Sequence, residues 1–297
     1  RYHPLEDPSP HQVIQENGKA LPEEGYVTDR FGDAAVRFIE ANHEKPFFLF
    51  VSFTAPHGPL QPKVGDLAAL QDIDKPRRRN YAGLVKCLDD NVGKVLAALK
   101  AHGLERDTLV VFTNDNGGQT QTGANNAPLR GRKGMLLEGG IRVPMCMRWP
   151  GTIEPGAVID DPVISLDLLP TFVRAAGGET PEAWALDGID LGPRLAGEVS
   201  ALPERPFFWR QRGETGEIAM RLGSLKLRID RREEDAHPEL YDLQTDIGEA
   251  TNLAERFPEN VELLTTMLAH WEDQLEAPRW RYARKGGRKR DRKPRER

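Results

Sequence analysis

Two short apolar runs, separated by a long amphipathic segment, constrain the fold of this chain more than any other feature. The runs cover residues 47–53 and 108–113, and segments containing Pro or Gly follow both of them. Between the runs, residues 77–102 place apolar side chains at i, i+3 and i+4 spacing, which predicts a helix that Gly103 ends. Strand, helix and strand in this order are typical of an α/β fold with a mostly parallel sheet flanked by helices. We expect the first run to form a strand that is buried on both faces.

The pattern of alternating strands and helices continues to about residue 200 and then changes. Before that point, further elements are predicted at residues 29–41 (helix), 143–148 (strand) and 165–176 (helix, capped by Ser165 or Asp167). After it, short runs predict half-exposed antiparallel strands at residues 206–209, 218–221 and 225–229, and the segment at residues 239–243 precedes a last helix at residues 258–275. We therefore expect an α/β domain at residues 1–200, a smaller C-terminal subdomain of antiparallel sheet plus helix at residues 201–280, and a tail at residues 281–297.

The tail is strongly basic, whereas the rest of the chain is acidic. Residues 281–297 carry ten Lys or Arg and two Asp or Glu, although the whole 297-residue chain has a net charge of −5. Such a tail can bind nucleic acid, but no aromatic side chain follows Tyr282 to stack on bases. We expect a disordered, solubilising terminus and no nucleic-acid partner. No apolar run reaches the ~18 residues of a membrane-spanning helix, and the residues after Arg1 show no signal peptide, so we interpret the chain as a fragment or a processed product.

The chain has two cysteines, Cys87 and Cys146, and no Cys-x-x-Cys pair. This number excludes zinc-binding frameworks and disulfide-rich scaffolds. Both cysteines have apolar sequence neighbours, so we expect two buried free thiols, with a single disulfide between them as the alternative.

Hard oxygen donors follow directly after the second predicted strand, in the segment Asn114-Asp-Asn-Gly-Gly118. Ligands of open α/β sheets bind beyond the carboxyl ends of strands. Asp115 and Asn116 offer oxygen ligands there to a divalent cation, although they do not by themselves complete the shell of about six to eight oxygens that calcium takes. The alternative is a plain turn, which Asn and Gly favour.

Two further side chains are candidates for binding an oxyanion. Lys133 lies in the segment Arg130-Gly-Arg-Lys-Gly134, where glycines let the backbone approach a ligand and the ammonium can hold an anionic oxygen. His57 lies between Pro56 and Gly58, just beyond the first predicted strand, where it could donate to an oxyanion or protonate a leaving oxygen near neutral pH. The alternatives are a solvated basic loop for Lys133 and a structural histidine for His57.

Several segments match one known family in their order and spacing. They are Pro-Phe-Phe-Leu-Phe-Val at residues 46–51, Ala-Pro-His-Gly-Pro at 55–59, Asn-Asp-Asn-Gly-Gly at 114–118, Pro-Leu-Arg-Gly-Arg-Lys-Gly at 128–134, Glu-Gly-Gly-Ile-Arg-Val-Pro at 138–144, Asp-Leu-Leu-Pro-Thr at 167–171 and Glu-Leu-Tyr-Asp-Leu at 239–243. On these motifs the chain resembles the C-terminal half to two-thirds of type I sulfatases, in the alkaline-phosphatase-like superfamily. The resemblance implies an alkaline-phosphatase-like α/β domain with a smaller C-terminal antiparallel sheet and helix.

The resemblance also implies roles for the candidate residues. Asp115 and Asn116 would be two ligands of a calcium ion. Lys133 would contact the sulfate, and His57 would contact the sulfate or the leaving oxygen. In this family a formylglycine, made from the Cys or Ser of a C/S-x-P/A-x-R motif, attacks sulfur as its hydrated diol. No cysteine or serine of this chain fits that motif, so we expect the nucleophile and the remaining metal ligands to lie upstream and this chain alone to be inactive.

The function implied by the resemblance is hydrolysis of a sulfate ester on a small molecule or a glycan. A phosphodiesterase or phosphonate hydrolase of the same superfamily is one alternative, because a metal ion and a tetrahedral oxyanion suit either reaction. A non-catalytic relative that binds sulfated glycans is another. The family also implies a periplasmic, secreted or lysosomal protein.

Overall fold

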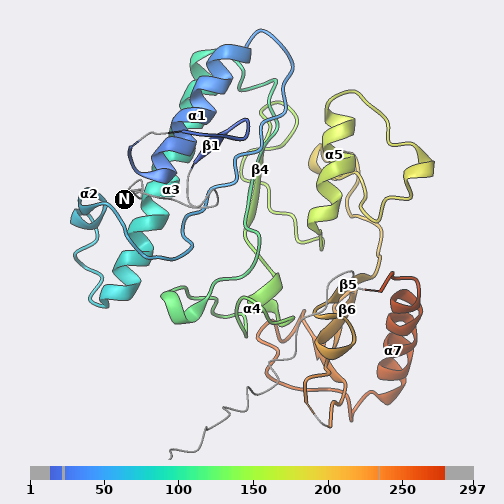
Figure 1. Ribbon diagram of the computed structural model, residues 1–297. Coiled ribbons are helices and arrows are strands. Elements are labelled where there is room, and N and C mark those ends of the chain that lie inside the picture. The colour runs from blue at the N-terminus through green and yellow to red at the C-terminus, as the bar shows by residue number, and fades with distance from the viewer. Residues whose placement is uncertain (1–13, 22–23, 234, 278–297) are drawn as a thin grey trace, which may run out of the picture. The chain divides into compact units, whose positions relative to one another are not determined.

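The computed structural model describes residues 14–21, 24–233 and 235–277 (Figure 1). The chain forms two compact units. Of the described residues, unit 1 contains those up to 126 together with residues 143–202, and unit 2 contains residues 127–142 together with those from 203 onward. The segment that carries Lys133 therefore belongs to the C-terminal unit. The predicted basic tail lies outside the described residues.

Unit 1 is built on two long helices that pack against each other, α1 (Val27–Asn42) and α3 (Pro76–Ala101) (Figure 1). The helix predicted at residues 77–102 is confirmed as α3, which has a proline at its first position, where no helical hydrogen bond is lost. Ile39 of α1 and Leu99 of α3 are almost completely buried between the two helices. This apolar contact holds the N-terminal half of unit 1 together.

The described strands of unit 1 pair in an antiparallel way, so the parallel pairing expected from the sequence is not seen among them. β3 (Val110–Thr113) pairs with β4 (Met145–Arg148), and Phe112 lies opposite Cys146. Both cysteines are free thiols, but Cys146 is exposed, so the expectation of two buried thiols is wrong for this residue. The reason is its position on β4, where successive side chains alternate between a half-buried and an exposed face.

The prediction of a doubly buried strand at residues 47–53 is also wrong for the described part of the chain. These residues belong to no strand, and Phe48 and Phe50 are 70% and 78% exposed. A strand needs a neighbour that completes its backbone hydrogen bonds, and no described strand pairs with this segment. Phe48 instead packs against Phe172 of α5 (Leu168–Ala175), with ring centroids 5.8 Å apart.

Shorter elements complete unit 1. They are β1 (Gln15–Glu16), β2 (Lys19–Ala20), α2 (Val64–Ala68), α6 (Gly192–Leu195) and the 3-10 helices η2 (Thr120–Thr122), η3 (Ser165–Asp167) and η4 (Glu182–Trp184). η3 leads directly into α5, and together they form the helix predicted at residues 165–176. Among the described residues of the whole chain, no helix is both long and apolar enough to cross a membrane.

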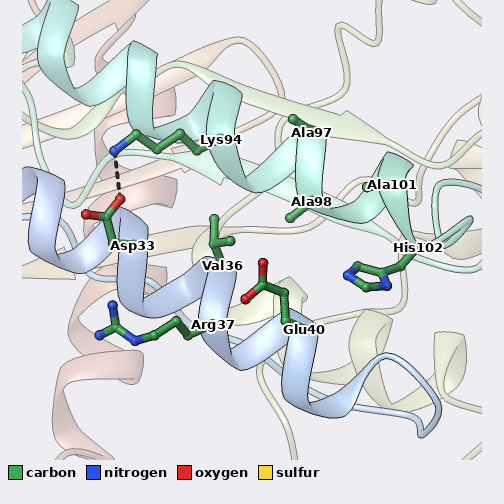
Figure 2. Close-up of a pocket in the computed structure, with 9 residues that line it drawn as sticks. All are labelled: Asp33, Val36, Arg37, Glu40, Lys94, Ala97, Ala98, Ala101 and His102. Atoms are coloured by element: carbon green, nitrogen blue, oxygen red, sulfur yellow. Dashed lines mark hydrogen bonds and ion pairs between the residues drawn. The ribbon is translucent and has the colours of Figure 1, made fainter.

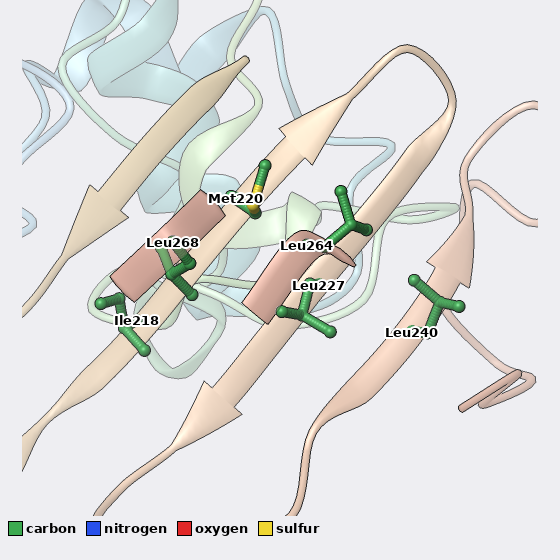
Figure 3. Close-up of a cluster of buried hydrophobic side chains, with 6 residues drawn as sticks. All are labelled: Ile218, Met220, Leu227, Leu240, Leu264 and Leu268. Atoms are coloured by element: carbon green, nitrogen blue, oxygen red, sulfur yellow. The ribbon is translucent and has the colours of Figure 1, made fainter. Parts of the chain in front are cut away.

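Unit 2, as far as it is described, is an antiparallel sheet with a helix on one face. The strands lie in the order β5 (Phe207–Arg210), β6 (Glu217–Leu222), β7 (Leu225–Asp230) and β8 (Glu239–Asp242), and the 3-10 helix η5 (Gly213–Thr215) precedes β6. The final helix, α7 (Pro258–Asp273), packs on this sheet over a core of Ile218, Met220, Leu227, Leu240, Leu264 and Leu268 (Figure 3). The predicted C-terminal sheet plus helix is therefore present.

The opposite face of the same sheet is charged and buried, which corrects the expectation of half-exposed strands. Alternation along β6 and β7 places Glu217, Lys226 and Arg228 on this face, where they are 0%, 0% and 6% exposed. Residues 127–142, which include α4 (Glu138–Ile141), bind this face through hydrogen bonds and ion pairs. Glu217, Lys226 and Arg228 thus face protein and not water.

Candidate active site

Asp115 and Asn116 follow directly after β3, where the sequence placed them. Asp115 is exposed and Asn116 is half-buried. The Asn116 amide donates from Nδ2 to the Gly117 carbonyl oxygen at 3.0 Å, so Oδ1 is the atom left for a ligand. Carboxylate and amide oxygens are the donors that hard cations such as calcium prefer. The described residues contain no group of three or more His, Cys, Asp or Glu side chains that could hold a metal ion, so this pair offers only part of a coordination shell.

The loop that follows Asn116 is tied to the start of α3. Within the loop, Asn126 accepts a hydrogen bond from the Gly118 N–H at 3.0 Å and donates from Nδ2 to the Gly118 carbonyl oxygen at 2.9 Å. Arg77, in the first turn of α3, donates from Nη1 to the Gln121 carbonyl oxygen at 2.7 Å. These bonds give the loop a defined shape next to the helix.

His57 lies in an exposed turn beyond residues 47–53. Its backbone N–H donates to the Thr54 carbonyl oxygen at 2.8 Å, and its ring Nδ1 lies 2.9 Å from the Gly58 carbonyl oxygen. Because a carbonyl oxygen only accepts, Nδ1 must carry the hydrogen, which leaves the lone pair of the neutral ring on Nε2. Nε2 is therefore the nitrogen that can exchange a proton with a ligand.

A hollow of about 410 Å³ in unit 1 brings these two candidate segments together. It is lined by Gly58, Pro59, Leu60, Arg77, Asn80 and Thr122. The first three residues follow His57 directly, and Thr122 belongs to the loop beyond Asn116. The turn of His57 and the loop after the proposed metal ligands thus border one hollow, with the first turn of α3 between them.

A larger hollow of about 600 Å³ lies between α1 and α3 (Figure 2). Asp33 and Lys94 form an ion pair across it at 2.7 Å, and Arg37 and Glu40 add one charge of each sign. None of the residues predicted to bind metal or sulfate lines either hollow, but the smaller one is lined by the residues directly after His57 and by Thr122 of the loop beyond Asn116. We therefore place the candidate site at the hollow beside the His57 turn.

Lys133 lies in unit 2, on a segment that folds back on itself. The Gly139 N–H donates to the Arg130 carbonyl oxygen at 2.7 Å, and this hydrogen bond joins the two ends of the segment that contains Lys133. Gly131 and Gly134 have φ angles of +91° and +84°, which favour glycine. Lys133 is half-buried and forms no ion pair with the described residues, so its ammonium is free to bind an anion.

The side chains that support this segment were not predicted. Glu217 Oε2 accepts from the Leu136 N–H, and Glu249 Oε2 accepts from the Glu138 N–H, both at 2.7 Å. Lys226 Nζ lies between Glu138 and Glu249, at 2.7 and 2.8 Å from their carboxylate oxygens. The alternation of charged and apolar residues in β6 and β7 was a signal for this arrangement, but it fits a strand face exposed to water equally well.

Solved structures define the class to which this fold belongs. Ps i-CgsB, determined in complex with k-i-k-neocarrahexaose, is 33% identical to this chain with a TM-score of 0.82, over 89% of this chain and 59% of that chain. BT4656, determined in complex with its substrate D-glucosamine-2-N,6-O-disulfate, shares the fold with a TM-score of 0.71 at 20% identity, over 87% of this chain and 72% of that chain. The expected α/β fold with a C-terminal antiparallel sheet is confirmed as that of the alkaline-phosphatase-like sulfatases.

Sequence comparisons give the family. The sulfatase family model matches residues 2–178, and the model for the C-terminal region of N-sulphoglucosamine sulphohydrolase matches residues 132–276. A sulfatase of Formosa agariphila is 35% identical over 260 residues, and mouse steryl-sulfatase is 38% identical over 183 residues. These alignments cover 78% and 59% of this chain but 47% and 28% of the two relatives, so the chain spans less than half the length of either. The chain belongs to the sulfatase family.

Proposed function

We propose that this chain is part of an enzyme that hydrolyses a sulfate ester. The observation that carries the proposal is the hollow in unit 1 of a sulfatase-family chain, because the His57 turn and the loop after Asp115 and Asn116 both border it. A proton donor and hard oxygen ligands on neighbouring loops suit a substrate group that is tetrahedral and negatively charged.

Asp115 and Asn116 would hold a divalent metal ion, and calcium fits their oxygen donors. Such an ion, when bound, would offset negative charge on the sulfate. The exposed Asp115 carboxylate brings negative charge to the ion, and Asn116 brings Oδ1, since its Nδ2 is engaged with Gly117. The remaining ligands would come from an upstream region of the protein.

The nucleophile would be a formylglycine in the same upstream region, which supplies a hydrated aldehyde for attack on sulfur. No cysteine or serine of this chain fits the C/S-x-P/A-x-R motif. In this proposal the chain alone does not turn over substrate, and it contributes residues that bind the sulfate and move a proton.

Lys133 and His57 act on the substrate itself. The Lys133 ammonium binds a sulfate oxygen and offsets its charge as a point cation. His57, when protonated at Nε2, donates that proton to the leaving oxygen as the S–O bond breaks. The Gly58 carbonyl oxygen, at 2.9 Å from Nδ1, keeps a hydrogen on Nδ1, so Nε2 is the nitrogen that gives up its proton.

The proposed substrate is a sulfated glycan, with a sulfated small molecule as the second class. The neighbour at 33% identity was solved with k-i-k-neocarrahexaose, which favours an oligosaccharide. Other relatives are named steryl-sulfatase and arylsulfatase, and these names support the small-molecule class. We place the protein in the periplasm, outside the cell or in the lysosome, and we propose no nucleic-acid partner.

Steady-state kinetics of the protein with its upstream region test the proposed roles of Lys133 and His57. With a chromogenic aryl sulfate, we expect Lys133→Ala and His57→Ala each to lower kcat/KM by more than about 10-fold, a loss of at least ~1.4 kcal/mol of transition-state stabilisation. Lys100→Ala and His270→Ala change exposed residues of the same types and are expected to leave kcat/KM unchanged. Losses no larger than those of the controls would contradict the proposal.

The same protein distinguishes the two alternative functions. A phosphate diester that is hydrolysed faster than the matching sulfate ester would identify a phosphodiesterase. Binding of a sulfated oligosaccharide without any release of sulfate, in a protein that contains the upstream region, would identify a glycan-binding relative.

A further inference from the structure

Unit 2 contains a buried charged cluster on the sheet face that the Lys133 segment covers. We call Glu138, Glu217, Lys226 and Glu249 the carboxylate–lysine cluster; these residues are 3%, 0%, 0% and 0% exposed. Lys226 Nζ lies 2.7 Å from Glu138 Oε1 and 2.8 Å from Glu249 Oε1, and Arg228 donates to Glu217 at 3.1 Å. Burial of charged groups is unfavourable unless each of them is paired, and here each of them is.

The same carboxylates also bind the backbone of the segment that carries the proposed sulfate-binding lysine. Glu217 accepts from the Leu136 N–H and Glu249 from the Glu138 N–H, each at 2.7 Å. On the other side of the lysine, Arg130 donates from Nη1 to the Glu249 carbonyl oxygen at 2.7 Å. Hydrogen bonds to ionised groups are stronger than neutral ones, so the segment is held firmly on both sides.

The backbone of Glu249 is in an unusual conformation. Its φ angle is +51°, in the left-handed region that few residues other than glycine adopt. Its side chain is nevertheless a fully buried carboxylate, and burial raises the pKa of this carboxyl above its ordinary value. Strain of this kind persists where the surrounding structure fixes the conformation.

Stability alone does not account for the cluster. When apolar residues of similar size replace a buried ion pair, the protein is often as stable as before or more stable. Apolar side chains, however, offer no acceptors for the Leu136 and Glu138 N–H groups, which would then be buried without partners. What the carboxylates supply is a defined conformation of the segment that they bind.

We propose that the carboxylate–lysine cluster fixes the backbone of residues 130–139 and thereby the position of the Lys133 ammonium. Glu217 and Glu249 are positioning residues that act through the backbone of this segment, and Lys226 holds Glu249 and Glu138 in place. The consequence for sulfate binding rests on the function proposed above for Lys133, whereas the fixing of the segment does not.

Replacement of Glu249 by glycine tests the carboxylate without disturbing the turn, because glycine adopts this φ angle freely. In Glu249→Gly we expect amide hydrogen exchange of residues 130–139 to become at least about tenfold faster, while amides of β6 and β7 change by less than about threefold. We also expect acylation of Lys133 by an amine-reactive ester to become faster relative to Lys100, an exposed lysine of α3.

Glu272→Gln is the matched control, because Glu272 pairs with Arg231 in the same unit and not with the lysine-bearing segment. It is expected to speed exchange in α7 and to leave residues 130–139 unchanged. Should Glu249→Gly fail to fold, Glu249→Gln keeps an acceptor for the Glu138 N–H and removes the charge beside Lys226. That variant is expected to speed exchange of residues 130–139 by about threefold.

Two results would overturn the proposal: unchanged exchange of residues 130–139 in the folded variant, or equal acceleration throughout β6 and β7. Neither measurement involves a substrate. A failure of the sulfate-ester function would appear in the kinetics of Lys133→Ala and would leave the exchange result as it is, so the two failures are distinguishable.

Discussion

Single residues decide how closely α1 packs on α3. A Cβ atom at Gly32 of α1 would lie 2.1 Å from Oδ1 of Asn91 on α3. Asn91 is completely buried, and its Nδ2 donates to Asp29 at 2.9 Å and to the Cys87 carbonyl oxygen at 2.8 Å, so it has no room to move away. The close approach of the two helices depends on the absence of a side chain at position 32.

Gly32→Ala is therefore expected to destabilise the protein by about 1–3 kcal/mol, the usual effect of overpacking, although alanine favours helix formation. Gly93→Ala is the control, because no atom would lie within 4 Å of the added Cβ in α3. It is expected to stabilise by about 0.5–1 kcal/mol. Urea unfolding followed by circular dichroism measures both, and a Gly32→Ala variant at least as stable as the unchanged protein would contradict the packing.

The two thiols are expected to differ sharply in reactivity. Burial, and after it the nearby Asp29 carboxylate, raise the pKa of Cys87 to about 11, so little thiolate forms near pH 8. Cys146 is exposed. A thiol reagent should modify one cysteine in the native protein and both in denaturant, and Cys146→Ser should abolish the native reaction. Rapid labelling of Cys87 in native Cys146→Ser would show that its surroundings are open.

At the scale of whole elements, helices were predictable where strand pairing was not. The spacing within residues 77–102 was enough for α3, because helical hydrogen bonds join residues that are close in sequence. A strand depends on a distant partner, and residues 47–53 pair with no described strand despite their composition. The strands β6 and β7 were predicted, but their alternating charges did not reveal that protein covers the charged face.

Within the candidate site, too, some features could be predicted from the sequence and others could not. The strand that ends just before Asp115 and Asn116 was predicted from the local run of apolar residues, and the structure confirms it as β3. Glu217 accepts a hydrogen bond from the Leu136 N–H, and Glu249 accepts one from the Glu138 N–H. The donors lie 81 and 111 positions earlier in the sequence than the carboxylates that bind them. No local pattern encodes such contacts, so the support of the Lys133 segment became visible only in the folded unit.

Besides its apolar contacts with the sheet, α7 forms ion pairs through the carboxylate of Glu272. Arg231 donates to both oxygens of Glu272 at 2.8 and 2.6 Å, and Arg210 adds a longer bond at 3.4 Å. The bonds from Arg231, more than any other influence, hold the pKa of Glu272 below its ordinary value of 4.5. Because the folded-state pKa is the lower one, ionised Glu272 adds stability above pH 4.5, and that stability is lost as the pH falls through the folded-state pKa.

We accordingly predict that the difference in the free energy of unfolding between the unchanged protein and Glu272→Gln depends on pH. The variant should be less stable at neutral pH, and the difference should shrink as the pH falls below 4.5, since protonation removes the same charge. Urea unfolding at a series of pH values measures it. If the free energies of unfolding of the two proteins changed equally with pH in this range, protonation of Glu272 would not be what weakens the attachment of α7.

At the scale of the whole molecule, the proposed functional residues are shared between two units. Asp115, Asn116 and His57 belong to unit 1, and Lys133 belongs to unit 2. The chain leaves unit 1 after residue 126, contributes residues 127–142 to unit 2 and returns at residue 143. The C-terminal sheet thus has a proposed role in catalysis through the segment that it holds.

The most direct test of the whole account is sulfate release by the protein with its upstream region, compared between the unchanged protein and Asp115→Asn. The substitution keeps the size of the side chain and removes the charge that would bind the metal ion. We predict that kcat/KM falls by about 100-fold or more, that added calcium restores part of it, and that a chelator inactivates the unchanged protein. Asp107→Asn, at another exposed aspartate of unit 1, should have no effect. Full activity of Asp115→Asn, or of the unchanged protein in chelator, would contradict the account.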